Sequence, residues 1–247
     1  MDRRSLIFGG TALFAASIPW LSGCGGGGSP LPSPTPSPSP SPSPGSGRLR
    51  TLRAGDRFSF SASGRATSDR GVLTDVAGDA AVVYLDTLFF GASALGERFL
   101  ANLQGSGVTL PLDSITYVSQ DSSAAIVLLG REDAFSGEPL PSVGTYVETP
   151  GQLSDGLTRT ENRVIGGRSS TAVFTVVGRE SVTVPAGTFD AFRCRRTEDF
   201  DAVGEFWTDT LWYVPSFGHW VKARIERADT GGTTLALDLE MTSSQLG

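Results

Sequence analysis

The chain has 247 residues, of which 39% are hydrophobic, and its formal net charge is −6 at pH 7. An acidic protein of this kind is not drawn to phosphate backbones, which excludes nucleic acid as its expected partner. Without residues 1–23, which include Asp2, Arg3 and Arg4, the formal net charge would be −7.

Residues 1–23 have the three parts of an export signal. Two arginines are followed by an apolar run from Leu6 to Leu21 and then by small residues. The sequence Leu21-Ser22-Gly23-Cys24 resembles the bacterial lipobox, in which a lipid is transferred to the cysteine before cleavage. We therefore expect cleavage between Gly23 and Cys24, and acyl chains such as palmitate on Cys24.

A multiply acylated Cys24 would hold the chain to a membrane without a transmembrane helix. Gly25 follows it, where an aspartate commonly marks inner-membrane retention in Gram-negative lipoproteins. By that resemblance we expect the outer membrane, with the chain facing the periplasm. Arg3-Arg4-Ser5-Leu6-Ile7 also looks like a degenerate twin-arginine signal, so general-secretory and twin-arginine export both remain open.

Residues 24–47 form a linker rich in glycine, serine and proline. Proline occupies every second position from Pro30 to Pro44. Proline fixes φ and lacks an N–H group. We therefore expect this stretch to be a disordered region that packs against nothing and adopts an extended polyproline-like form. At about 3.1 Å per residue it would reach about 60–70 Å. We interpret it as a spacer, with recognition by a proline-binding partner as the alternative.

Residues 48–247 are predicted to form a single antiparallel β-domain. Large apolar residues alternate with small or polar ones, which places one strand face in a core and the other in water. This pattern occurs in Phe58–Ala62, Val221–Glu226 and Leu235–Met241. Ala124–Leu129 and Ala172–Val177 are almost continuously apolar, which predicts strands covered on both faces.

Turn residues punctuate these runs about every ten positions, which gives roughly a dozen strands. Gly91–Arg98 and Arg131–Ser136 are each predicted to form a short helical turn. The fold class is therefore mainly β, with little helix. So many strands in one open sheet would leave exposed edges, which favours a curved sheet or an incomplete or closed barrel.

Three segments carry a resemblance to a known family. Val177–Phe192 contains the motif Val184-Pro185-Ala186-Gly187-Thr188-Phe189, and Trp212–Lys222 and Leu52–Phe58 add a second and a third segment. They resemble the TapB-like family of poorly characterised bacterial lipoproteins. That resemblance implies a curved sheet or open barrel akin to the lipoprotein carriers LolA and LolB, and no known reaction. Ser216 departs from the family pattern, which usually has a glycine there.

The motif also makes structural sense without a ligand. Pro185 suits the first central position of a tight turn, Gly187 tolerates a positive φ, and Phe189 can fold back onto a core. We interpret the motif as a hairpin turn, with the rim of a ligand mouth as the alternative.

His219 is the single histidine, so any Ser-His-Asp or Cys-His mechanism must use it. A dyad with Cys194 is geometrically open, but alternation with Phe192 favours an inward Cys194 that packs as a small hydrophobe. Lipidation of Cys24 leaves Cys194 without a disulfide partner in the chain.

Four carboxylates lie in and after a predicted loop: Asp199, Asp201, Glu205 and Asp209. The spacing of a calcium loop is absent, so we expect a solvated acidic turn and no metal or cofactor. A glycosidase could use two such acids, but carboxylate pairs are common in acidic proteins.

Aromatic residues are concentrated within fourteen positions. Trp207 and Tyr213 share one strand face and Trp212 takes the other. We expect core packing, and the alternative is a pocket or rim for an acyl chain, sugar or protein formed by Trp207, Trp212, Tyr213, Phe217, His219 and Trp220.

The leading functional hypothesis is a non-enzymatic, lipid-anchored β-domain of the cell envelope that binds an apolar ligand or an envelope protein. The first alternative is an envelope hydrolase that acts on glycans or lipids through its acidic residues. The second is a scaffold or assembly component that works through its surface.

Overall fold

The computed structural model describes residues 47–67, 71–106, 108–132, 137–200 and 204–247, and every regular element in these ranges is a β-strand. No helix in them is long and apolar enough to cross a membrane. The predicted signal peptide, Gly23, Cys24 and the proline-rich spacer up to residue 46 lie outside the described residues. The strands are β1 (Arg57–Thr67), β2 (Leu73–Phe89), β3 (Ala92–Gly105), β4 (Val108–Gln120), β5 (Ile126–Glu132), β6 (Pro139–Thr149), β7 (Thr158–Ile165), β8 (Arg168–Val184), β9 (Gly187–Phe200), β10 (Glu205–Val214), β11 (His219–Asp229) and β12 (Gly232–Gln245).

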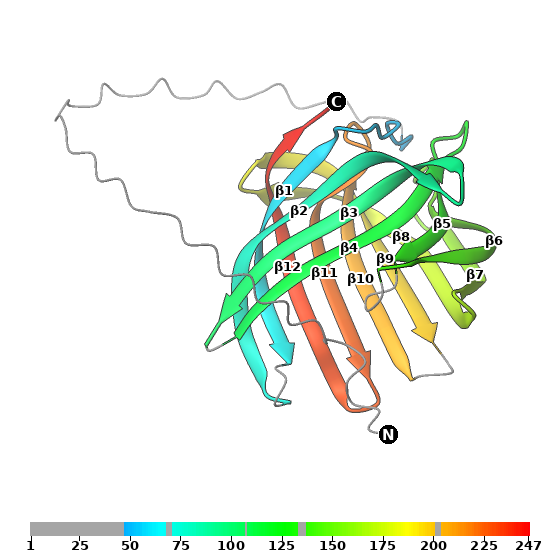
Figure 1. Cartoon of the computed structure of the whole chain (residues 1–247). Helices are drawn as coiled ribbons and strands as arrows, with labels where there is room; N and C mark the ends of the chain where they lie inside the picture. The colour runs from blue at the N-terminus through cyan, green and yellow to red at the C-terminus, as the bar shows by residue number, and fades with distance from the viewer. Residues whose placement is uncertain (1–46, 68–70, 107, 133–136, 201–203) are drawn as a thin grey trace, which may run out of the picture. The chain divides into compact units, whose positions relative to one another are not determined.

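The twelve strands close into one antiparallel barrel (Figure 1). Each strand pairs with its neighbours in sequence, and β1 pairs with both β2 and β12, which joins the two ends of the sheet. This confirms the predicted antiparallel β-fold of about a dozen strands. Of the architectures left open by the sequence, the chain adopts the closed barrel, in which β6 and β7 are joined by one residue pair, Ser142 with Ile165.

The predicted helical turn at Gly91–Arg98 was wrong. Phe89 pairs with Ala92 across the two-residue turn Phe90–Gly91, and the chain then runs on as β3. Ladder hydrogen bonds to β2 and β4 override the weak helical pattern there. Of the second predicted turn, Arg131 and Glu132 belong to β5, and residues 133–136 lie outside the described residues.

One strand prediction also needs correction. In Ala172–Val177 the residues do not pack on both sides, because buried and partly exposed positions alternate and Val177 is 48% exposed. The β8 strand therefore has one face in the lumen and one in water, like most of the barrel wall. In contrast, Ala124–Leu128 is buried throughout.

The core lies inside the barrel, where side chains at every second position of each strand meet. Phe58 and Phe60 on β1 and Leu237, Leu239 and Met241 on β12 are all at most 1% exposed. The outward positions between them are serines and acidic residues. The alternation of apolar and polar residues in the sequences of β1, β11 and β12 therefore correctly predicts which side chains face the lumen.

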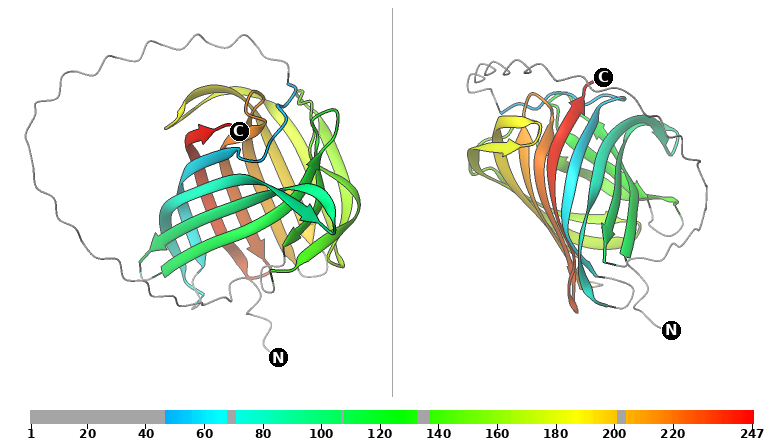
Figure 2. Two further views of the ribbon diagram at one scale, coloured as in Figure 1. Left: turned by 45° about the horizontal axis from the view of Figure 1, so that its top comes forward. Right: turned by 90° about the vertical axis from the view of Figure 1, so that its left-hand side faces the viewer.

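A strap formed by residues 47–56 closes one end of the barrel (Figure 2). Leu49 N–H donates to Gly151 O and Arg50 N–H to Pro215 O, both at 2.8 Å, and Leu52 N–H donates to Gln120 Oε1 at 2.6 Å. Leu49 and Leu52 are almost fully buried. The strap thus ties together turns that belong to opposite sides of the wall. We call this end of the barrel the strap end.

The Val-Pro-Ala-Gly-Thr-Phe motif forms a hairpin between β8 and β9, as predicted, with Pro185 and Ala186 as the two turn residues. Its tip reaches the strand on the other side of the opening, because Ala186 N–H donates to Met241 O at 2.9 Å. Phe189 packs against Phe217, with ring centroids 5.5 Å apart. The motif therefore helps to cover the strap end.

Candidate functional site

Away from the strap end, the lumen contains a group of ion-paired side chains from six strands, which we call the lumen network. The strands β6 and β9 are not neighbours in the sheet, yet Glu148 on β6 forms an ion pair with Arg196 on β9. The network therefore spans the lumen. Its members are Arg131, Glu148, Arg163, Arg196, Glu198, Asp209 and Arg227.

Two clusters of contacts make up the lumen network. In the first, Arg131 donates to Glu198 at 3.1 Å and Arg163 to Glu148 at 2.7 Å. Ser170 also donates to Glu198, at 2.8 Å. These contacts join β5, β6, β7, β8 and β9 from inside the barrel.

In the second cluster, Asp209 lies between two guanidinium groups. Arg196 donates to its Oδ2 at 2.5 Å and Arg227 to its Oδ1 at 2.6 Å. Both Asp209 and Glu198 are about 2% exposed, so each carboxylate depends on its partners for compensation of its charge.

Strand alternation explains how the sequence places these charges inside. Along β9, Cys194, Arg196 and Glu198 occupy the inward positions, while Arg195 and Thr197 face outward. The sequence signal for a buried charge is a charged residue two or four positions from a core residue on the same strand, because such residues share one face of the sheet. The sequence alone did not single out the four arginines of the network, Glu148 or Glu198, because a charged residue on a strand usually faces water.

Electrostatics keep Glu148 and Asp209 charged. Burial alone would raise the pKa of Glu148, but the guanidinium groups of Arg196 and Arg163 hold it well below its usual range. Asp209 is also buried, and Arg227 and Arg196 lower its pKa below the ordinary value. Neither group is thus available as a proton donor near neutral pH.

Apolar side chains lie on the lumen face of β3 and β4, and this face borders the network because Thr116 on β4 pairs with Arg131 on β5. Phe99, Leu110 and Leu112 are only partly buried there. Ser114 pairs directly with Phe99, so it shares the lumen side, and it is nevertheless exposed. Water therefore reaches this level of the lumen, and partly exposed apolar side chains line it.

Glu97 connects the apolar face with the network. It lies two residues before Phe99 on β3 and accepts a hydrogen bond from Tyr84 Oη at 2.9 Å. Burial raises the pKa of Glu97, the Tyr84 hydrogen bond opposes that rise, and the charges of Glu148 and Arg196 also act on it. The side chain thus stands within reach of the electrostatic field of the network.

Trp207 is the aromatic member of this region. The guanidinium carbon of Arg227 lies 4.6 Å from its ring centroid and that of Arg131 lies 5.1 Å away, which are cation–π distances. Arg131 and Arg227 are 16% and 22% exposed. A ligand that entered the lumen here would meet two accessible guanidinium groups around one indole ring.

The six predicted rim residues do not form one rim. Tyr213, His219 and Trp220 are buried in the core, and Phe217 packs against it next to the strap end. Trp207 joins the lumen network. Trp212 lies on the outer face, where its Nε1 donates to Glu180 at 2.6 Å and Lys222 Nζ lies 5.7 Å from its ring.

His219 and Cys194 do not act together in this structure. His219 stacks on Phe58 at 4.2 Å and its Nδ1 donates to Trp220 O at 2.8 Å, whereas Cys194 Sγ donates to Phe192 O. Burial lowers the pKa of His219 to about 4 and raises that of Cys194 to about 12. Near neutral pH the imidazole is neutral and the thiol is protonated.

The predicted acidic turn is divided between two faces of the sheet. Asp209 is buried in the lumen network, while Asp199 is exposed on the outer face. Glu205 begins β10, and Asp201 lies outside the described residues. Asp199 and Asp209 therefore cannot converge on one substrate atom.

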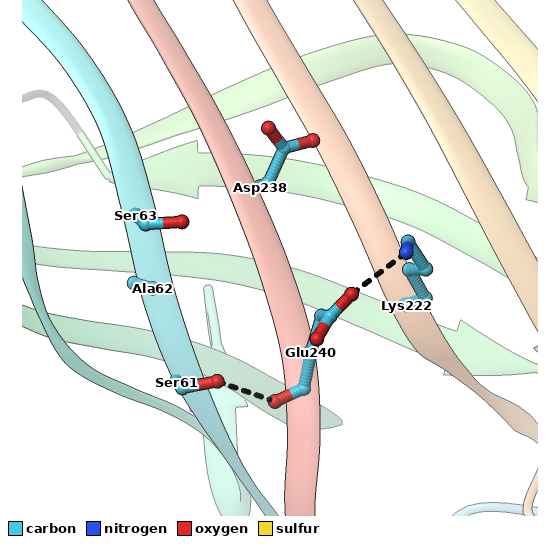
Figure 3. Close-up of a pocket in the computed structure, with 6 residues that line it drawn as sticks. All are labelled: Ser61, Ala62, Ser63, Lys222, Asp238 and Glu240. Carbon is cyan, nitrogen blue, oxygen red and sulfur yellow. Dashed lines mark hydrogen bonds and ion pairs between the residues drawn. The ribbon is translucent and has the colours of Figure 1, made fainter. Parts of the chain in front are cut away.

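A shallow pocket lies on the outer wall over β1, β11 and β12 (Figure 3). It is lined by Ser61, Ala62, Ser63, Lys222, Asp238 and Glu240. Lys222 donates to Glu240 at 2.7 Å, and Ser61 Oγ makes a long hydrogen bond to Glu240 O. Lys222 is already paired with Glu240, and the lining faces water, so the pocket is a weaker candidate than the lumen.

The chain matches no protein-family model and no curated protein. The resemblance to the TapB-like family therefore stays a prediction. Two solved structures are similar in part. A protein from Bacteroides fragilis, described as exported and with a YmcC-like fold, is 11% identical, with a TM-score of 0.39 over 81% of this chain and 99% of that one.

The second is described as a lipoprotein, from Parabacteroides distasonis. It is 13% identical, with a TM-score of 0.36 over 81% of this chain and all of that one. At these scores the similarity carries no argument about activity, so the function has to be argued from the lumen.

Proposed function

We propose that the chain is a lipid-anchored binding module of the bacterial cell envelope whose lumen takes an anionic amphiphile. The observation that carries this proposal is that one lumen holds both kinds of group: partly exposed apolar residues lie on β3 and β4, and Thr116 on β4, four residues after Leu112, pairs with Arg131 of the lumen network. An acyl chain would contact Phe99, Leu110 and Leu112, and its acidic group would meet Arg131 and Arg227.

One donor of the network lacks an acceptor among the described residues. Arg163 is 3% exposed, and among the described residues its Nε atom finds no hydrogen-bond partner. A buried donor without an acceptor costs about 1–3 kcal/mol. A carboxylate or phosphate oxygen is the kind of group that would satisfy it, and guanidinium groups bind both in a forked geometry.

The width of the barrel supports the same interpretation. Eight strands enclose about as much space as side chains can fill, and wider barrels commonly enclose ligands. With twelve strands, this barrel fills the strap end with aromatic and aliphatic side chains. Charged side chains from β5, β6, β7, β9, β10 and β11 line another part of the lumen.

The envelope location rests on residues 1–47. The proposed lipid on Cys24 would tether the barrel to the membrane, and the spacer would let it move tens of ångströms from the surface. We propose the periplasmic side of the outer membrane. Incorporation of radiolabelled palmitate into the wild-type chain, and its loss in Cys24→Ala, would test the anchor.

Ligand binding can be tested with the barrel alone, because residues 44–247 form one compact unit that contains every strand. The probe is a dansyl-labelled fatty acid, whose emission rises in an apolar site. We expect saturable binding of the acid and binding at least about tenfold weaker for its uncharged methyl ester, which is about 1.4 kcal/mol. No saturable binding, or equal binding of acid and ester, would contradict the proposal.

Arg131→Gln is the informative variant and Arg193→Gln is its matched control. Arg193 is 42% exposed on the outer face of β9, so its loss should leave the lumen unchanged. We expect Arg131→Gln to weaken the acid but not the ester, and Leu112→Gln to weaken both. If Arg131→Gln bound the acid with unchanged affinity, the lumen network would not be part of the binding site.

A further inference from the structure

The hairpin between β2 and β3 has an unusual turn. Phe90 and Gly91 are its two central residues, with φ values of 48° and 83°. Positive φ at both positions is the geometry of a type I′ turn, for which Asn-Gly is strongly preferred. A bulky side chain in the left-handed region is strained, so phenylalanine is a poor choice for folding alone.

The same turn presents apolar side chains to solvent. Leu88 and Phe90 are each 68% exposed, and among the described residues no large hydrophobic side chain is more exposed. We call these two residues the hairpin tip. A strained aromatic residue that is also exposed indicates a role outside the fold.

The hairpin tip stands on a rigid base. Phe89 is only 8% exposed, and its ring lies 4.8 Å from that of Phe90 and 4.7 Å from that of Tyr117. A methyl group on Gly130 would come within 2.5 Å of the Phe89 ring, so that glycine makes room for the base. The tip is therefore held in place by packing beneath it.

The hairpin tip belongs to the strap end of the barrel. Tyr84 on β2 exchanges backbone hydrogen bonds with the strap, at 2.9 Å to Gly55 and to Asp56, and β2 continues beyond Tyr84 to Phe89 (Figures 1 and 2). The strap begins at Gly47, so the proline-rich segment that leads back to Cys24 also joins the barrel at this end. The tip and the tether thus share one end of the molecule.

We propose that the β2–β3 hairpin places Leu88 and Phe90 in the lipid surface to which Cys24 anchors the chain. This inference rests on the proposed lipid anchor. Docked in this way, the barrel turns its strap end toward the membrane and the lumen network away from it. The acyl chains bring the barrel near the membrane, and the tip sets its orientation.

A lipid surface fits the hairpin tip better than a protein does. A stable protein interface buries about 800 Å² on each partner, and two side chains on a turn supply only a fraction of that. Burying a leucine and a phenylalanine side chain in lipid is favourable enough for a second membrane signal beside an acyl anchor. The two tip residues themselves carry no charge that would have to be desolvated.

The test uses the mature lipidated chain in vesicles of phosphatidylethanolamine and phosphatidylglycerol. The environment-sensitive dye NBD is attached to Ala92→Cys, beside the tip, and in a separate protein to Ser63→Cys, on the outer face of β1. Both positions are exposed, Cys194 is buried, and Cys24 is acylated, so each protein has one reactive thiol. Doxyl-labelled lipids report contact of the dye with the bilayer.

We expect a blue-shifted emission and several-fold stronger quenching at position 92 than at position 63. Equal quenching at both positions, or a blue shift at position 92 without lipid quenching, would contradict the membrane contact. Vesicle flotation measures the anchor separately. Flotation without quenching overturns the hairpin contact alone, whereas loss of flotation overturns the anchor and the inference that rests on it.

Phe90→Asn in the Ala92→Cys protein separates a membrane role from a structural one. Asparagine suits this turn, so the urea midpoint should stay the same or rise while lipid quenching falls several-fold. Leu88→Ser should lower the quenching in the same direction. If Phe90→Asn lowers the midpoint and leaves quenching unchanged, Phe90 serves the fold and the inference is wrong.

Discussion

Glu148 and Arg196 form an ion pair through the inside of the barrel, although the strands β6 and β9 that carry them are separated in the sheet by β7 and β8. The pair holds two parts of the wall at a fixed separation. Thr149 next to Glu148 adds a hydrogen bond to Tyr213 on β10, at 3.0 Å. The same contacts that shape the candidate site therefore also determine the cross-section of the lumen.

The first prediction concerns the stability that this arrangement provides. Glu148→Gln leaves Arg163 and Arg196 without one of their carboxylates in a buried place, and breaking a buried pair in this way typically costs about 3–5 kcal/mol. We expect a loss of that size in the free energy of unfolding, measured with urea. Glu226→Gln is the control, because Glu226 pairs with Arg224 on the surface and should change stability by less than about 1 kcal/mol.

The second prediction is a pH dependence that comes from one group. His219 is the single histidine, and its pKa is about 4 in the folded chain against 6.5 ordinarily, because burial opposes the charge. As pH falls below 6.5, the unfolded chain binds a proton that the folded chain does not. Stability is therefore full above pH 6.5 and is lost as pH falls toward 4, by about 3 kcal/mol at most.

Most carboxylates do not titrate between pH 7 and 5.5, and Glu97, whose pKa is raised by burial, would change stability in the opposite sense to His219. Of the groups close to His219, Asp56 acts against the shift, and Tyr84 stays protonated because burial raises its pKa. Urea unfolding should show a loss of about 1 kcal/mol between these two pH values. In His219→Gln that difference should vanish, and a variant that kept it would show that another group is responsible.

The third prediction concerns the reactivity of Cys194. A pKa near 12 leaves about a thousandfold less thiolate than the ordinary value of 9, and the side chain is fully buried. Iodoacetamide should modify Cys194 only at the rate at which the barrel unfolds. Fast modification of the native protein, followed by mass spectrometry, would contradict the packing and reopen a nucleophilic role.

Much of the fold could be predicted from the sequence because the barrel wall obeys a two-residue period. Leu235, Leu237 and Leu239 show it plainly, and all three face the core. The Phe90–Gly91 turn could not be found in this way, because phenylalanine is not a residue that signals a type I′ turn. Without a recognisable turn before them, Gly91–Arg98 have the pattern of a short helical turn.

The candidate site was harder to predict for a different physical reason. A charged residue at an inward position looks like a solvated one until its partner is known, and the partner of Arg196 lies 48 positions away. Closeness in sequence suggests that the aromatic residues form one rim, but Trp212 and Tyr213 point to opposite faces of the sheet. Contacts across a lumen are set by barrel closure, which local patterns do not contain.

The last prediction tests how the strap is held. Asp56 is fully buried and accepts hydrogen bonds from the Arg50 guanidinium, from Arg53 N–H at 2.8 Å and from Gly247 N–H at 2.8 Å. It therefore fastens the strap and the last residue of the chain with one side chain. Burial would raise its pKa, but these hydrogen bonds lower it below the ordinary value.

Asp56→Asn removes the charge and one acceptor, and we expect it to lower the free energy of unfolding by about 3 kcal/mol. The strap should unfold locally at a lower free energy than the whole barrel, since it can detach while the strands stay paired. Hydrogen exchange should therefore accelerate at Leu49, Arg50 and Leu52 more than in β1. Asp121→Asn, in an exposed turn at the same end of the barrel, is the control, and equal acceleration in both variants would show that Asp56 does not hold the strap.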